Sequence, residues 1–315
     1  MTHVAASSPS SEPTFEVGVV LPPMGAAVEG GRITLQEAAR HAEDVGLDSV
    51  WVGDHLATGM PSLDNAVALA TVAAVTERVR VGTSVFVPAL RPVAWAAKQV
   101  ASLQHVAQGR LVLGVGSGGG EAQWAAAGVP YGERGRRTDT ALRLLPDLLA
   151  GRPTRLEDEP GQPLVELAPA VPMPPVWVGN ASPAAIRRAA RFGDGWFPSL
   201  VGPTEVAAGV ARLVELAEGP SQPPHTVAIG GVVALGNGPG VPKRAEIAGS
   251  IAAGYGRPEH EVADIPIVGT PVQAAEQLAT YRAAGAHHAV VGIAGGDWRH
   301  QCDLLAEARA ALLRR

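Results

Sequence analysis

Short apolar runs alternate along the chain with longer stretches whose apolar residues recur at helical spacing. Eight runs are continuously apolar and rich in β-branched residues, which predicts buried strands. The predicted strands, the fourth with a glycine-rich end, occupy residues 15–21, 48–54, 79–87, 110–120, 175–179, 195–199, 225–235 and 287–295. The predicted helices occupy residues 34–46, 62–77, 92–108, 121–127, 133–149, 182–192, 204–218, 242–255, 270–284 and 298–313. Strands that alternate with helices require a parallel sheet, and eight such units predict an α/β fold closed as a (β/α)8 TIM barrel.

One segment breaks this alternation. Residues 151–174 hold six prolines and an acidic cluster at 157–159, which predicts an insertion with room for a small hairpin. Residues 1–14 lack apolar periodicity and are expected to form a disordered N-terminal tail. Residues 15–315 are therefore interpreted as a single barrel domain.

Composition narrows the classes of function. Of 315 residues, 46% are apolar and 17% charged, which excludes disorder of the whole chain. A net charge of −5 disfavours a nucleic-acid or anionic-membrane partner. The single Cys302 excludes an internal disulfide and a thiolate metal cluster, and it fits a reducing compartment. No transmembrane run or signal peptide is recognisable, so a cytoplasmic location is expected.

Candidate chemistry gathers at the ends of predicted strands, where the working residues of such barrels lie. The second, third, fourth and fifth strands end in unusual sequences: Asp54-His55, Thr83-Ser84-Val85, Ser117-Gly118-Gly119-Gly120 and Gly179-Asn180-Ala181-Ser182. The first is suited to proton transfer or hydrogen bonding, although a lone histidine is often structural. No HExxH motif or carboxylate cluster is present, so no metal is expected.

Two of these ends are suited to an anion or a flat ring. Ser182 can cap a helix that begins at Pro183, and the exposed N–H groups of that end attract anions; an ordinary capped helix is the alternative. The glycines at 118–120 resemble a phosphate cradle or a surface for a planar ring, with a flexible turn as the alternative. His287 and His288 point to opposite sides of a strand and are not expected to share a ligand.

The strand-end segments together resemble the bacterial luciferase-like monooxygenase superfamily, and most closely its F420-dependent oxidoreductase branch, common in actinobacteria. The resemblance covers residues 15–313 and is carried in order by five segments: LDSVWVGDHL (47–56), GRLVLGVGSGG (109–119), GVPYGERGRR (128–137), PPVWVGNASPAAIRRAARFGDGWFP (174–198) and GTPVQAAEQLATYRAAGAHH (269–288).

The resemblance implies a homodimeric flavoprotein whose flavin or deazaflavin ring lies at the C-terminal mouth of the barrel. It places Asp54 and His55 beside the ring as the catalytic pair. The predicted cofactor-binding set includes seven residues that the resemblance implies: Ser84, Val85, Ser117, Gly118, Asn180, Ala181 and Ser182. Strand-end position adds Thr83, Gly119 and Gly179 to the set, and positive charge adds Arg136 and Arg137. Within that set, Ser84–Val85 corresponds to a non-proline cis peptide behind the ring, and 180–182 to the phosphate site. Gly119 stands where some F420-dependent sugar and alcohol dehydrogenases carry a carboxylate.

Three functions are compatible with the sequence. The first is an F420-dependent oxidoreductase that passes a hydride between the deazaflavin and a small organic substrate, with His55 as proton donor or acceptor. The second is an FMN-dependent monooxygenase supplied by a partner flavin reductase, and the third is a non-catalytic flavin-binding barrel. The acidic tail of coenzyme F420 requires basic groups near the mouth. Two basic clusters favour it unless they form solvated helix faces: Arg134, Arg136 and Arg137, and Lys243 and Arg244.

Overall fold

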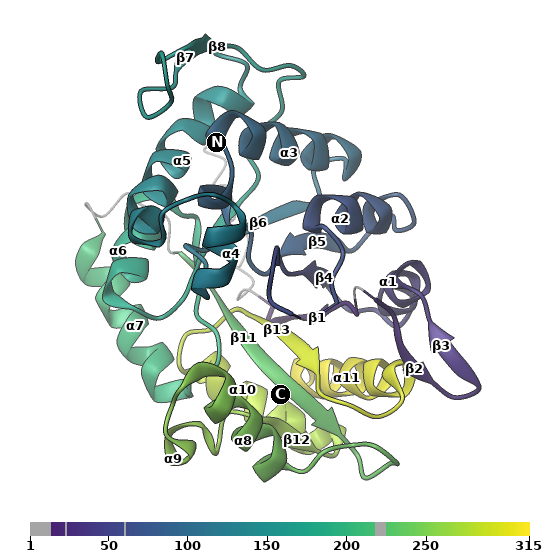
Figure 1. Cartoon of the computed structure of the whole chain (residues 1–315). Coiled ribbons are helices and arrows are strands. Elements are labelled where there is room, and N and C mark those ends of the chain that lie inside the picture. Colours follow the sequence, from purple (N-terminus) through teal and green to yellow (C-terminus); the bar gives the residue numbers. More distant parts are fainter. Residues whose placement is uncertain (1–13, 23, 60, 218–224) are drawn as a thin grey trace, which may run out of the picture.

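The computed structural model describes residues 14–22, 24–59, 61–217 and 225–315. Eight parallel strands close into a barrel surrounded by helices, which confirms the predicted TIM-barrel fold (Figure 1). Around the barrel the strands are β1 (Glu16–Val20), β4 (Ser49–Val52), β5 (Arg80–Thr83), β6 (Leu111–Val115), β9 (Val176–Gly179), β10 (Gly195–Phe197), β11 (Thr226–Leu235) and β13 (His288–Ile293). Pairing of β10 with β11 and of β13 with β1 completes the ring. The predicted tail at 1–14 lies, except for Thr14, outside the described residues.

In the part of the chain that the structure describes, ten helices lie on the outside of the barrel, and three of them start at side-chain caps that the sequence predicts. They are α1 (Leu35–Asp44), α2 (Asn65–Ala73), α3 (Val93–Val106), α4 (Glu121–Ala126), α5 (Arg134–Leu149), α6 (Pro183–Phe192), α7 (Pro203–Leu216), α8 (Arg244–Tyr255), α10 (Pro271–Ala283) and α11 (Trp298–Leu313). Thr34 and Thr270 form capping boxes, and Ser182 accepts a hydrogen bond from the Ala185 N–H. The predicted helix at 62–77 instead begins at Asn65, because the side chain of Asp64 accepts from the Val67 N–H.

The insertion contains the expected hairpin. Strands β7 (Thr154–Arg155) and β8 (Leu164–Val165) pair antiparallel and project at the top of Figure 1, above α3 and α5. Leu156 is buried and joins the main core, so the insertion is packed against the barrel's helices.

Four short elements were not predicted from the sequence. They are the β2 (Ala26–Val28) and β3 (Gly31–Ile33) hairpin, the helix α9 (Glu259–Val262), and the strand β12 (Ile267–Gly269) beside the end of β11. Segments of three or four residues are too short to show a hydrophobic period. The predicted strand at 79–87 was too long, since regular pairing stops at Thr83.

Aromatic side chains fill the middle of the barrel. Trp51, Trp177 and Phe197 pack together with centroid distances of 5.3–6.1 Å. A Cβ at Gly82 would come within 2.2 Å of the Trp51 ring, so only glycine leaves room for this indole. Trp196, in contrast, points outward into the core beneath the helices. All three tryptophans therefore serve packing.

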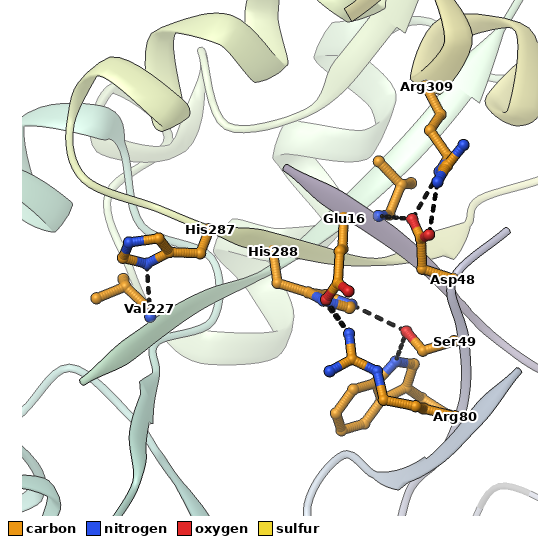
Figure 2. Close-up of polar contacts among 10 residues, drawn as sticks. Glu16, Asp48, Ser49, Arg80, Val227, His287, His288 and Arg309 are labelled. Atoms are coloured by element: carbon orange, nitrogen blue, oxygen red, sulfur yellow. Dashed lines mark hydrogen bonds and ion pairs between the residues drawn. The ribbon is translucent and has the colours of Figure 1, made fainter. Parts of the chain in front are cut away.

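A polar network lies at the end of the barrel where the strands begin (Figure 2). His288 lies 2.9 Å from both Glu16 Oε2 and Ser49 Oγ, and Arg80 pairs with the same carboxylate. The Trp51 N–H donates to Ser49 Oγ, so this hydroxyl connects the indole with the imidazole of His288. Burial and the nearby guanidinium lower the pKa of His288 to about 3.

The neighbouring His287 points away from this network, as Figure 2 shows. Its Nδ1 accepts a hydrogen bond from the Val227 N–H at 3.1 Å. The expectation that the two consecutive histidines face opposite sides of their strand is confirmed.

Candidate functional site

A cavity of about 530 Å³ lies at the C-terminal ends of the barrel strands. The aromatic layer forms its floor, where Phe197 is exposed to the cavity together with Val20 and Val290. Above this layer several strands carry glycine at the lining positions, including Gly53, Gly230 and Gly292. Because glycine has no side chain, the mouth stays open although the barrel below it is filled.

His55 reaches this cavity from the end of β4. A Cβ at Gly53 would lie 2.6 Å from His55 Nε2, so the imidazole lies across that glycine. The loop that carries the histidine is held by Gln123 on α4, which accepts from the Leu56 N–H and donates to the Gly119 carbonyl. The sequence prediction that His55 faces the mouth agrees with this geometry.

The side chain of Asp54, predicted to act together with His55, contacts Arg91 and Val87. Its carboxylate is buried and makes two hydrogen bonds to Arg91, at 2.8 and 3.0 Å, and a third to the Val87 N–H at 2.9 Å. The Arg91 guanidinium lies over the ring of Phe86, 4.7 Å from its centroid. Asp54 thus holds the segment that follows Ser84–Val85 in place through Val87 and Arg91. Among the described residues that line the cavity, Asp54 does not appear.

The Ser84–Val85 peptide bond is cis, as the resemblance implied. Ser84 lines the cavity, whereas Val85 projects against two glycines of the adjacent strands. A Cβ at Gly116 or Gly179 would come within 2.5 and 2.9 Å of the Val85 methyl groups. Thr83 is buried and donates to the Gly114 carbonyl, so its side chain serves strand pairing.

The glycine-rich loop after β6 borders a buried indole. Gly118 has φ of +63°, and a Cβ there would meet Val87 and Trp124 at 3.1 and 3.4 Å. The Trp124 Nε1 is buried and lacks an acceptor among the described residues. A Cβ at Gly119 would have no neighbour within 4 Å, so this part of the loop offers open space.

The end of β9 forms the helix N-terminus that the sequence predicts. Asn180, with φ of +83°, accepts from the Ser182 N–H through its side chain, and its carbonyl accepts from Trp196 Nε1. Ser182 and Pro183 are exposed at the start of α6. By position, the Ala184 N–H has no acceptor within the helix, so this end can receive an anion.

The basic residues predicted to contact the cofactor's acidic tail have partners within the protein. Arg136 pairs with Glu133 and with Asp158 of the insertion, each at 2.9 Å. Arg137 donates to the Ala89 carbonyl at 3.0 Å. Both lie on α5, and the described lining of the cavity includes neither.

Sequence reasoning missed the wall contributed by α8. Ile247 and Ile251, one turn apart, are buried against the cavity, which Pro242 also lines, and the exposed Tyr255 stands at its rim. Their spacing marks an apolar helix face, but every helix of such a barrel has one. The sequence therefore did not distinguish a helix face that borders the cavity from one that covers the barrel.

The described residues lack three further features: a cluster of metal ligands, a helix able to span a membrane and an activated thiol. It contains no group of three or more His, Cys, Asp or Glu that could hold a metal ion. Its helices include none long and apolar enough to cross a membrane. Burial raises the pKa of the Cys302 thiol to about 12, so this group is not an activated nucleophile.

Comparison with known proteins gives matches over most of the barrel. Residues 16–246 match the family model described as luciferase-like monooxygenase. The chain is 36% identical over 198 residues to the F420-dependent glucose-6-phosphate dehydrogenase of Beutenbergia cavernae, covering 59% of this chain and 58% of that protein. It is 35% identical over 162 residues to an uncharacterized protein of Mycobacterium tuberculosis, covering 51% and 56%. The matches thus span little more than half the length of these curated relatives.

Two solved structures show the same fold at low identity. An F420-dependent secondary alcohol dehydrogenase in complex with an F420-acetone adduct superposes with a TM-score of 0.77 at 17% identity, covering 95% of this chain and 99% of that one. The oxygenating constituent of 3,6-diketocamphane monooxygenase from Pseudomonas putida, in complex with FMN, gives 0.72 at 17% identity and the same coverage.

Proposed function

The chain belongs to the luciferase-like monooxygenase family, and from this premise we propose that it is an F420-dependent oxidoreductase acting on a small organic substrate. The observation that carries the proposal is the pairing of the His55 imidazole with the cis Ser84–Val85 segment in one cavity. The anion-accepting start of α6, outside the cavity lining, follows the C-terminal end of β9 on the same side of the barrel. The curated relatives named as F420-dependent dehydrogenases, at 33–36% identity, support the deazaflavin over other cofactors.

The residues at the mouth fit a tricyclic ring with a phosphate-bearing side chain. Ser84, with Val85 behind it, provides the surface for the ring, and the open space at Gly119 admits the side chain. The unpartnered Trp124 N–H beside Gly118 is a donor that a hydroxyl of the side chain can satisfy. The phosphate is assigned to the start of α6, at 180–182.

His55 is proposed as the group that handles the substrate's proton. When bound, the deazaflavin supplies the hydride donor or acceptor. His55 takes up the hydroxyl proton when an alcohol becomes a carbonyl, and returns it in the reverse direction. Its position across Gly53, at the edge of the cavity, leaves it accessible to a substrate oxygen.

Asp54 is proposed as a positioning residue. Three hydrogen bonds direct its carboxylate towards Arg91 and Val87, and the adjacent His55 is thereby fixed at the end of β4. The same contacts hold the segment after Ser84–Val85. Asp54 thus connects the two parts of the site that must face the ring and the substrate.

An FMN-dependent monooxygenase is the second candidate. It is favoured by the internal partners of Arg136 and Arg137, which leave the start of α6 as the evident anion site, and one such site is enough for FMN. That activity would require reduced flavin from a partner reductase. If either activity is present, replacement of His55 should lower turnover. A non-catalytic barrel would show no turnover even before the replacement.

A homodimer is also proposed. Large apolar side chains are exposed on the neighbouring helices α2 and α3, with Val67 61%, Trp95 67% and Val106 41% exposed. Such a surface is favourable to bury against a second copy. Light scattering after size-exclusion chromatography should give twice the 32.2 kDa mass of the chain, and Trp95→Lys should shift it towards the monomer.

The cofactor is tested by parallel fluorescence titrations of the apoprotein with F420 and with FMN at fixed salt. Micromolar or tighter binding of F420, with FMN at least tenfold weaker, is the expected result. The reverse order would transfer the proposal to the monooxygenase and its reductase. Binding of neither would leave the non-catalytic barrel as the best account.

A further inference from the structure

The far wall of the cavity, formed by β11, β13 and α8, is apolar. Val232, Pro242, Ile247 and Ile251 line it, and Tyr255 extends it to the rim. Two of these side chains, Ile247 and Ile251, are 95% removed from solvent. The remaining lining positions on β11 and β13 are Val290 and glycines, which add no polar side chain. Away from Glu246 and Ser250 of α8, a ligand that rests on this wall meets hydrocarbon.

Positive charge is missing from this wall. The described residues that line the cavity include no lysine or arginine, and the segments outside the described residues contain none in their sequence. Arg244 donates to Gln277 Oε1 at 2.8 Å, and Arg257 donates to the Leu200 carbonyl at 2.7 Å and pairs with Glu261. Lys243 is exposed and caps α8 outside the lining.

The acidic residue on the wall is Glu246. Its Oε2 accepts from the Lys243 N–H at the start of α8, and the residue is exposed to the cavity. Its negative charge opposes a phosphate or carboxylate that enters beside it. Apart from the imidazole of His55, the polar side chains in the described lining are the hydroxyls of Ser84, Ser199, Ser250 and Tyr255.

Given the proposed function, on which this step rests, we infer that the substrate is an uncharged, largely hydrocarbon alcohol or carbonyl compound. Its single oxygen meets His55 and its hydrocarbon part packs on the Ile247–Ile251 wall. A sugar phosphate is disfavoured, because a desolvated phosphate requires arginine, lysine or a free helix N-terminus, and the α8 N-terminus beside the cavity is capped by the Glu246 carboxylate. The start of α6 is not part of the described cavity lining and is assigned to the cofactor.

The inference is tested by calorimetric binding, which does not depend on turnover. The ligands are 2-butanol, 2-hexanol, 2-octanol and glucose 6-phosphate, each titrated into the apoprotein and into the F420 complex. Each added methylene should tighten binding about fourfold, the equivalent of about 0.8 kcal/mol. Glucose 6-phosphate should show no saturable binding at concentrations that saturate with 2-octanol.

Substitutions on α8 test whether the alkanols bind on the Ile247–Ile251 wall. Ile251→Ala should weaken 2-octanol binding several-fold, and Tyr255→Ala, at an exposed position that does not threaten folding, should weaken it to a smaller extent. Ala253→Ser is the matched control, because Ala253 is on the same helix, exposed and outside the lining. It should leave every affinity unchanged.

Three results would overturn the inference: tighter binding of glucose 6-phosphate than of 2-hexanol, alkanol affinity independent of chain length, or no detectable binding of 2-octanol. The F420 titration of the same sample is read separately. If F420 does not bind, the proposed function fails, while the order of the ligands on the apoprotein still decides the chemistry of the cavity.

Discussion

Acid should destabilise this protein through His288. The imidazole is fully buried, and its pKa is lowered from 6.5 to about 3, first by burial and then by Arg80. Below pH 6.5 the unfolded chain binds a proton at this residue that the folded chain does not accept. The stabilisation is therefore complete above pH 6.5 and is lost progressively as the pH falls towards 3.

The magnitude follows from the two pKa values. The linkage relation gives a loss of about 2 kcal/mol in unfolding free energy between pH 8 and pH 5. For a domain of this size that corresponds to a fall in Tm of about 3 °C. The loss would reach its limit of about 4–5 kcal/mol only below pH 3, where the folded state also accepts the proton.

Urea unfolding, followed by tryptophan fluorescence from pH 8 to pH 5, measures this loss. His288→Gln removes the titrating group, so the stability difference between wild type and variant should shrink by about 2 kcal/mol over that range. His260→Gln, at an exposed position on α9, is the control and should run parallel to wild type. Parallel curves for wild type and His288→Gln would show that the proton linkage is not at this residue.

Three further predictions concern the mouth of the barrel. Asp54→Ala leaves Arg91 half-buried without its carboxylate and should lower the unfolding free energy by about 3 kcal/mol in urea titrations; a double-mutant cycle with Arg91→Ala that shows no coupling would refute the pairing. His55→Ala should bind F420 within a few-fold of wild type but lose at least a hundredfold in kcat, and an unchanged kcat would remove His55 from proton transfer. Replacing Arg136 and Arg137 together by Gln should weaken F420 more than FMN if they serve the acidic tail, and coincident titration curves would assign them to packing alone.

The sequence by itself determined the architecture of this protein. The alternation of apolar runs with capped helices predicted all eight barrel strands, because buried parallel strands leave a strong and local signal. Caps at Thr34, Ser182 and Thr270 were equally readable, since a cap requires only a side chain and an N–H three residues away. The insertion was evident from its prolines.

Tertiary structure decided which residues contact one another at the site. Adjacent in sequence, Asp54 and His55 were interpreted as one catalytic pair, but the partner of Asp54 is Arg91, 37 positions away. The apolar wall on α8 and the neutral His288 also depend on residues from distant strands and helices. A sequence pattern records which face of an element is buried, but what lies against that face depends on how the closed barrel brings remote segments together.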